Sequence, residues 1–263
     1  MSDHAGRLDA MRIAAPLVQN ITNYVAMNVM ANVMLAAGAS PAMVHAREEV
    51  AEFATIASAL TINIGTLTPA WVDGMVEAAK AASEAGTPWV LDPVAVGATS
   101  YRYKTAQRLL AFNPTVTRGN ASEIIVLSGA AKTGKGVGAT DDVDRALLAA
   151  RSIAQRTGGI VAVTGAEDFV TDGTREAWVA NGHPIMPAVT ALGCALNGIV
   201  AAFLATGDDA FEATITALAY YGLAGEQAGE TAQGPGSFAV AFLDALAGMD
   251  ADRLQAGAKI RRV

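Results

Sequence analysis

The only cysteine in the chain, Cys194, closes a short turn and opens a run of small and apolar residues from 195 to 205. This pattern predicts a turn that leads into the N-terminus of a helix. The first N–H groups of a helix have no internal partner and carry a partial positive charge, so a phosphate can bind to them. The same field is expected to lower the pKa of the thiol. Cys194 is therefore either a reactive group beside a bound phosphate or a buried structural cysteine.

Other polar residues follow the ends of predicted strands. Asp92 and Thr164 each end such a strand, and Arg118 directly follows another. Ligands of open parallel sheets bind beyond the carboxyl ends of the strands, where these side chains would meet. This convergence favours the functional interpretation of Cys194.

The residue types at this edge indicate phosphate and magnesium chemistry. The guanidinium of Arg118 is suited to clamp a phosphate. Asp92 and Glu123 could hold Mg²⁺ through water molecules, because this ion keeps much of its hydration shell. Glu123 also stands three residues after Asn120, as in a helix capping box, so a purely structural role for it stays open. The three histidines of the chain lack metal-ligand spacing, which argues against zinc.

Residues 129–136 nearly match the mononucleotide-binding loop G-x-x-x-x-G-K-[ST]. Gly136 stands where the loop needs a hydroxyl to bind magnesium. The preceding residues, 121–128, predict a helix rather than a strand entering the loop. We interpret this match as accidental and the segment as a surface connection.

The elements that must position these residues alternate between strands and helices. A buried strand over 60–64, a helix from Pro69 to Gly86 and a second strand over 88–92 predict a right-handed βαβ unit. Segments 169–171 and 177–179 predict an antiparallel hairpin near the sheet edge. The chain after Cys194 is expected to be almost wholly helical. With no linker or repeat, we expect one domain over 1–263, a three-layer α/β/α fold with a mostly parallel sheet.

Composition narrows the classes of partner. Hydrophobic residues make up 52% of the chain and charged residues 16%, a mixture that suits helices packed on a buried sheet. The net charge of −7, without a lysine and arginine cluster, argues against nucleic acid. No apolar run reaches membrane-spanning length, and the first residues lack a signal-peptide core. A single cysteine cannot form an internal disulfide, so we expect a cytoplasmic protein.

A set of motifs, in order along nearly the whole chain, resembles the hydroxyethylthiazole kinases of the ribokinase-like superfamily. The motifs are Asn-Ile-Thr-Asn at 20–23, Gly-Ala-Ser-Pro-Ala-Met at 38–43, Asn-Ile-Gly-Thr-Leu at 63–67, Leu-Asp-Pro-Val-Ala-Val-Gly-Ala at 91–98, Arg-Gly-Asn-Ala-Ser-Glu at 118–123, Val-Thr-Gly at 163–165, Gly-Cys at 193–194 and Gly-Pro-Gly-Ser-Phe at 234–238. The resemblance implies ATP-dependent phosphorylation of the hydroxyl of 4-methyl-5-(2-hydroxyethyl)thiazole, in thiamine salvage.

The resemblance also implies roles for individual residues. Arg118 and Thr164 would contact ATP, and Met43 would contact the thiazole. Asn23, together with Asp92 and Glu123, would belong to the surroundings of Mg²⁺ and the phosphates. The resemblance further implies a homotrimer with its sites between neighbouring subunits, in which Asn23 and Met43 face a partner chain.

One turn departs from the family pattern. Many members carry a glycine where this chain has Ala191, and Leu192 adds bulk beside it. Ala191 and Gly193 are expected to lie close to the substrate, so the departure is expected to change how the substrate fits. A kinase for a related hydroxyalkyl heterocycle is therefore an alternative function.

In the kinase interpretation, the helix that begins near Gly193 holds the γ-phosphoryl group and Cys194 acts as general base toward the alcohol. Three rival interpretations remain. A cysteine hydrolase would need a histidine beside Cys194. A nucleotidase would need Lys135 of the 129–136 segment for ATP binding. A sensor that only binds thiazole or nucleotide would not need the set of Asp92, Glu123 and Cys194.

Overall fold

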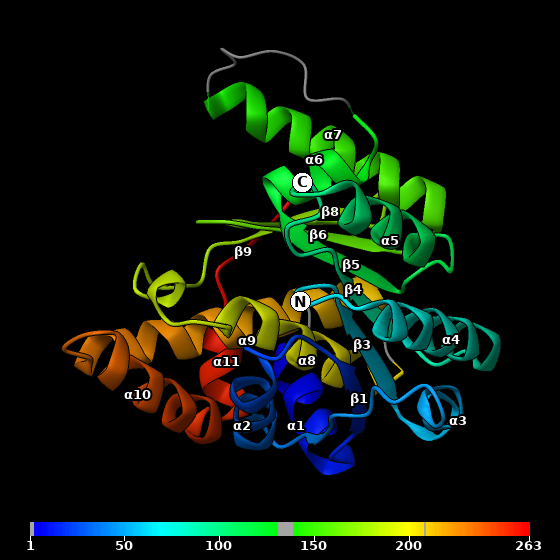
Figure 1. Cartoon of the computed structure of the whole chain (residues 1–263). Helices are drawn as coiled ribbons and strands as arrows, with labels where there is room; N and C mark the ends of the chain where they lie inside the picture. Colours follow the sequence, from blue (N-terminus) through cyan, green and yellow to red (C-terminus); the bar gives the residue numbers. More distant parts are fainter. Residues whose placement is uncertain (1–2, 131–138, 208) are drawn as a thin grey trace.

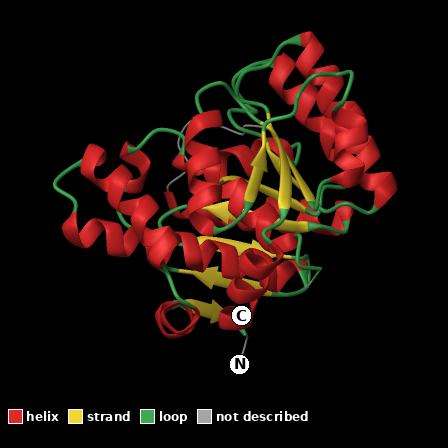
Figure 2. Ribbon diagram, turned by 90° about the horizontal axis from the view of Figure 1, so that it is seen from below, coloured by secondary structure: helices red, strands yellow, loops and turns green. Residues whose placement is uncertain are grey.

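The chain forms three layers, with a sheet between two sets of helices (Figures 1 and 2). This computed structural model describes residues 3–130, 139–207 and 209–263. Within those ranges the sheet has the strand order β2-β1-β3-β4-β5-β6-β7-β8-β9. The predicted three-layer α/β/α class is confirmed. Most of the segment 129–136 lies outside the described residues.

The first six strands of the chain pair in parallel. They are β1 (Leu17–Ile21), β2 (Ser40–Ala42), β3 (Ala59–Asn63), β4 (Trp89–Asp92), β5 (Val116–Asn120) and β6 (Ile160–Thr164). The β3 and β4 strands are buried along their whole length, because helices cover both faces of the sheet. All carboxyl ends of these strands therefore lie along one edge of the sheet.

The last three strands are antiparallel. β7 (Asp168–Thr171) and β8 (Glu176–Val179) form the predicted hairpin. The outermost strand, however, is β9 (Ile260–Arg262), so the expectation of an almost wholly helical chain after Cys194 is wrong at this segment. Its three residues carry no periodic signal of their own. Pairing with β8 creates the strand, and the Arg261 guanidinium lies 5.4 Å from the Trp178 ring centroid.

The helices divide between the two faces of the sheet, and each set shares one hydrophobic core. One face is covered by α1 (His4–Ala14), α2 (Met27–Ala37), α8 (Leu192–Leu204), α9 (Ala210–Thr231), α10 (Pro235–Gly248) and α11 (Ala251–Gly257). The other is covered by α3 (Val50–Ile56), α4 (Pro69–Ala85), α5 (Ser100–Leu110), α6 (Ala121–Leu127) and α7 (Ala139–Thr157). A short 3-10 turn, η1 (Met186–Ala188), precedes α8. Among the described helices, none has the length and apolarity needed to cross a membrane.

The predicted βαβ unit is confirmed in detail. Thr68 caps α4 by accepting a hydrogen bond from the Trp71 N–H, and Pro69 occupies the first turn. Gly86 ends the helix with a φ of 72°, a conformation that glycine adopts without strain. The β3 and β4 strands then pair in parallel, which places Asn63 directly beside Asp92.

The position of the α8 helix determines where Cys194 lies. It packs between the sheet and α2, and a side chain at Gly198 would collide with Met34, since an added Cβ would lie 2.5 Å from the sulfur. This close approach fixes the position of the helix. Its N-terminus is thereby directed toward the carboxyl edge of β3 and β4.

Candidate active site

The turn before α8 has the predicted helix N-terminus. Leu192, Gly193 and Cys194 are its first three residues, and the first helical hydrogen bond runs from the Ala195 N–H to the Ala191 carbonyl (2.8 Å). Ala191 precedes the helix with a φ of 65° and caps it without a side-chain hydrogen bond. The N–H groups of the first turn are therefore available to an anion.

Cys194 lies at this turn and is half-buried. Asn23 donates a hydrogen bond from Nδ2 to its sulfur over 3.4 Å. Burial, and then the negative charge of Asp92, raise the pKa of the Cys194 thiol. The expected lowering of this pKa is therefore wrong, because the loss of solvation outweighs the favourable field of the helix end.

Three buried asparagines and one carboxylate form a continuous hydrogen-bonded group, which we call the amide network: Asn23, Asn63, Asp92 and Asn197. Asn23 Nδ2 donates to Asn63 Oδ1 over 2.9 Å. Asn63 Nδ2 and Asn197 Nδ2 both donate to Asp92 Oδ2, over 2.7 and 2.6 Å. The network joins the ends of β1, β3 and β4 to the first turns of α8.

Asn63 and Asn197 are site residues that the sequence analysis did not single out. The sequence nevertheless contains a signal for each of these two residues. Asn63 lies near the end of a predicted buried strand, as Asp92 does, and Asn197 stands three residues after Cys194 and so shares its helix face.

Asp92 is the charged member of the network. Its side chain is deeply buried, and this burial raises its pKa to about 6, against the opposing influence of Arg118 and the two amide donors. The Arg118 guanidinium approaches Asp92 Oδ2 to 3.6 Å. The carboxylate is thus solvated by protein groups in place of water.

Arg118 connects three elements at this edge. Its Nη1 donates to the Gly193 carbonyl over 2.8 Å, and its Nη2 donates to the Thr164 hydroxyl over 3.0 Å. The predicted convergence of Asp92, Arg118, Thr164 and Cys194 is confirmed. One guanidinium therefore fixes β5, β6 and the start of α8 relative to one another.

Glu123 forms the capping box that was one of its two interpretations. Its Oε2 accepts from the Asn120 N–H and its Oε1 accepts from the Ala95 N–H, both over 2.8 Å. Its charge nevertheless acts on Asp92, whose pKa it raises. The structural role is present, and the carboxylate is close enough to Asp92 for its charge to act there.

Met43 lies outside this cluster. It follows β2, the edge strand beyond β1, and packs half-buried against the hydrophobic core. Leu192, which adds bulk beside Ala191, is buried in the core and also forms part of a cavity wall. Gly193 is exposed at the turn.

A cavity of about 740 Å³ opens beside the helix tip. Arg118, Thr164 and Gly193 line it together with residues 181–184, Met186 and Pro187 and with Leu218 and Tyr221 of α9. Its size falls within the range of small-ligand sites.

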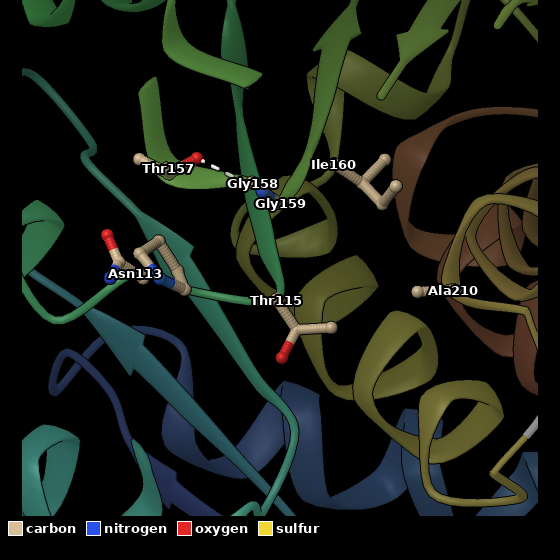
Figure 3. Close-up of a pocket in the computed structure, with 8 residues that line it drawn as sticks. Asn113, Thr115, Thr157, Gly158, Gly159, Ile160 and Ala210 are labelled. Carbon is tan, nitrogen blue, oxygen red and sulfur yellow. Dashed lines mark hydrogen bonds between the residues drawn. The ribbon is translucent and has the colours of Figure 1, made fainter. Parts of the chain in front are cut away.

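A second pocket, shown in Figure 3, measures about 260 Å³. Thr115 and Gly159 line it, and they precede β5 and β6 at the opposite edge of the sheet. It is therefore separate from the Cys194 cluster.

Comparison with known proteins shows likeness over nearly the whole chain. The model of the hydroxyethylthiazole kinase family matches residues 8–252. A hydroxyethylthiazole kinase of Cereibacter sphaeroides is 62% identical over 253 residues, covering 96% of each chain. One of Rhizobium johnstonii is 59% identical over 254 residues, covering 96% of this chain and 95% of the relative.

Solved structures agree with these relatives. A hydroxyethylthiazole kinase structure from Pyrococcus horikoshii matches with a TM-score of 0.92 at 40% identity and full coverage of both chains. A pyridoxal kinase from Staphylococcus aureus in complex with AMP-PCP and pyridoxal matches with a TM-score of 0.61 at 15% identity, covering 94% of this chain and 98% of the other. That second match concerns the fold alone.

Proposed function

The chain belongs to the hydroxyethylthiazole kinase family, and from this premise we propose that it transfers the γ-phosphoryl group of ATP to the hydroxyl of 4-methyl-5-(2-hydroxyethyl)thiazole, a thiamine salvage reaction. One observation carries the proposal. The N-terminus of α8, with Cys194 in its first turn, lies beside Arg118 at the end of the 740 Å³ cavity.

Arg118 and Thr164 are proposed to bind the phosphates of ATP, with the nucleoside in the cavity. The N–H groups of the first turn of α8, at Gly193 and Cys194, would stabilise the charge of the transferring group. Little covalent chemistry is needed from the protein, because alignment and charge stabilisation dominate phosphoryl transfer.

Asp92 and Glu123 suit Mg²⁺ better than a metal held entirely by protein. Within the described residues no three His, Cys, Asp or Glu side chains gather into a metal site. The two hydrogen bonds that the Asp92 side chain accepts, from Asn63 and Asn197, both end on Oδ2, which leaves Oδ1 for a hydrated ion. Mg²⁺ commonly binds one or two carboxylates together with water and substrate phosphates. When bound, it would neutralise part of the polyphosphate charge.

Cys194 is proposed to lie beside the attacking hydroxyl, which Asn23 would help to orient. The hydroxyl oxygen attacks the γ-phosphorus, the bond to the bridging oxygen of ADP breaks, and the hydroxyl proton leaves late because the transition state is loose. General-base catalysis is worth about 10²–10⁴-fold, and the raised pKa of the thiol favours the lower end of that range.

Two substitutions test this role. Cys194→Ala is expected to lower kcat by about 10²-fold with measurable activity left, and Cys194→Asp is expected to stay active because a carboxylate also accepts a proton. Steady-state kinetics on both variants, with circular dichroism as the control for folding, provides the measurement. A folded but inactive Cys194→Asp enzyme would contradict the base role.

We further propose that the active unit is a homotrimer in which Met43 reaches the thiazole site of a neighbouring copy. Apolar side chains near α2 support a partner surface, since Tyr24, Val25 and Leu35 are each more than half exposed. Light scattering after size-exclusion chromatography measures the mass of the particle. A monomer with full activity would contradict this arrangement.

Mass spectrometry of the product tests the reaction itself. The protein is incubated with ATP, Mg²⁺ and a panel of hydroxyethyl heterocycles that includes the thiazole alcohol. A gain of one phosphoryl group on the thiazole alcohol is expected. Phosphorylation of a different heterocycle of the panel, and not of the thiazole alcohol, would indicate that alanine in place of glycine at position 191 accompanies a different substrate. Binding of the thiazole alcohol without any product would indicate a sensor.

A further inference from the structure

We call one part of the lining of the 740 Å³ cavity the distal wall: residues 181–184, Met186 and Pro187 with Leu196, Leu218 and Tyr221. Under the proposed function, in which Arg118 binds the phosphates, this wall receives the nucleobase of ATP. The wall carries three side chains able to read a base by hydrogen bonding, namely Asn181, His183 and Tyr221. The partners of these three decide what the wall can recognise.

Asn181 is already bound to its own chain. Its Nδ2 donates to Glu226 Oε1 over 3.2 Å and to the Gly257 carbonyl over 3.0 Å. Its Oδ1 accepts from the Lys259 N–H over 2.7 Å. Both amide donors are thus used, and the side chain holds the wall together instead of facing a ligand.

Tyr221 is committed in the same way, and His183 is committed at one of its two ring nitrogens. Tyr221 donates its hydroxyl hydrogen to the Leu192 carbonyl over 2.8 Å. His183 Nδ1 accepts from the Ile185 N–H over 3.3 Å. Its other edge packs against α9, because a Cβ added at Gly229 would lie 2.5 Å from Nε2.

The backbone of 182–187 offers few donors either. Pro184 and Pro187 have no N–H. The Gly182 N–H donates to Glu226 Oε1 over 3.1 Å, and the Met186 N–H donates to the His183 carbonyl over 3.0 Å. The rest of the wall is apolar, with Met186, Leu196 and Leu218 facing the cavity.

Two further polar residues, Asn120 and Asp168, also line the cavity. Asn120 pairs with Thr164 across β5 and β6, and Asp168 Oδ1 accepts from the Gly165 N–H over 3.0 Å. Asn120 thus lies beside Thr164, and the charge of Arg118 acts on Asp168, so we place both near the proposed phosphate site.

We infer that the distal wall holds a purine by packing alone and does not distinguish adenine from guanine or hypoxanthine, so that other purine nucleoside triphosphates serve as phosphoryl donors. This inference rests on the proposed function. A site built to hydrogen-bond its ligand rejects an analogue by about 10⁴-fold, whereas apolar pockets discriminate by about 10–200-fold. Adenine and guanine have similar apolar faces, so the ratio is expected below about 30.

The test compares kcat/KM for ATP, GTP and ITP with saturating thiazole alcohol and Mg²⁺. The expected ratio of ATP to either analogue is below about 30, and a larger ratio for both would overturn the inference. Calorimetric titration with ADP and GDP, without the thiazole alcohol, gives the same comparison independently of turnover. Equal binding without product would contradict the proposed function alone, whereas product from ATP only would contradict this inference alone.

A substitution in the wall adds a second readout. Met186→Ala removes apolar surface and is expected to raise the KM values for ATP and GTP by the same factor, within twofold. Val240→Ala, at an exposed position of α10, is the matched control and should change neither KM value. A tenfold change in the ATP to GTP ratio of Met186→Ala would show that the wall reads the base.

Discussion

Ala191 holds a backbone conformation that alanine rarely adopts. Its φ of 65° and ψ of 0° lie in the left-handed region, directly before the helix that carries Cys194. This conformation costs an L-residue about 1–2 kcal/mol. Glycine adopts it without strain, but loses about 0.4–1 kcal/mol more in chain entropy on folding. Ala191→Gly is therefore expected to stabilise the protein by about 0.5–1 kcal/mol.

The assay is thermal unfolding followed by circular dichroism at a fixed protein concentration. For a chain of this size, 1 kcal/mol corresponds to about 2–4 °C, so Ala191→Gly is expected to raise Tm by about 1–4 °C. Ala10→Gly is the matched control, since Ala10 is exposed within α1. That change should lower stability by about 1 kcal/mol.

The opposite signs of the two substitutions make the comparison decisive. If Ala191→Gly destabilised the protein as much as Ala10→Gly does, the left-handed conformation would carry no strain and the reasoning would be wrong. Kinetics on Ala191→Gly would then show separately whether the missing glycine affects the fit of the substrate.

Two further predictions concern charges at the cavity. Arg118→Lys is expected to raise the KM for ATP by about 10–100-fold, because a single ammonium cannot bind both Gly193 and Thr164 as the planar guanidinium does. The control, Arg108→Lys at an exposed position, should leave this KM unchanged. A similar KM in both variants would contradict the role of Arg118 in phosphate binding. Burial raises the pKa of Asp168 to about 6, above its unfolded value of 3.8, so the folded state binds the proton more tightly and stability falls as pH rises from about 4 to 6. Asp168→Asn keeps the acceptor for the Gly165 N–H and is expected to add about 1–2 kcal/mol at pH 7. Asp92 contributes in the same direction. Urea unfolding of Asp168→Asn between pH 4 and 6 should therefore show a smaller, but not zero, dependence of the free energy of unfolding on pH. A pH dependence equal to that of the unsubstituted protein would refute the assignment to Asp168.

The predictable parts of the fold are those that local signals decide. The βαβ unit was predicted to within a residue or two, because Pro69 and Gly86 mark the helix ends and the flanking strands are continuous apolar runs. The β9 strand could not be predicted. Its three residues are extended only because β8 supplies partners more than 80 positions away in the sequence.

The site divides in the same way. Asp92, Arg118 and Thr164 were predicted to meet at one edge because each stands at the carboxyl end of a predicted parallel strand, and the structure confirms this. The pKa of Cys194 was predicted in the wrong direction, because its burial and its distance from Asp92 depend on how distant segments pack. The bond from Asn23 joins residues 171 positions apart, and no local pattern encodes it.

The make-up of the amide network limits where a proton can travel. An amide neither gains nor loses a proton near neutral pH, so the path from Asn23 through Asn63 to Asp92 conducts no hydrogen ion, although every step is a short hydrogen bond. Under the proposed function, the buried carboxylate therefore exchanges no proton with the acceptor alcohol through this network. The proton that the alcohol releases then passes either to the sulfur of Cys194 or to the newly formed phosphate ester. Solvent deuterium isotope effects on kcat of the Cys194→Ala enzyme would show which acceptor the reaction uses.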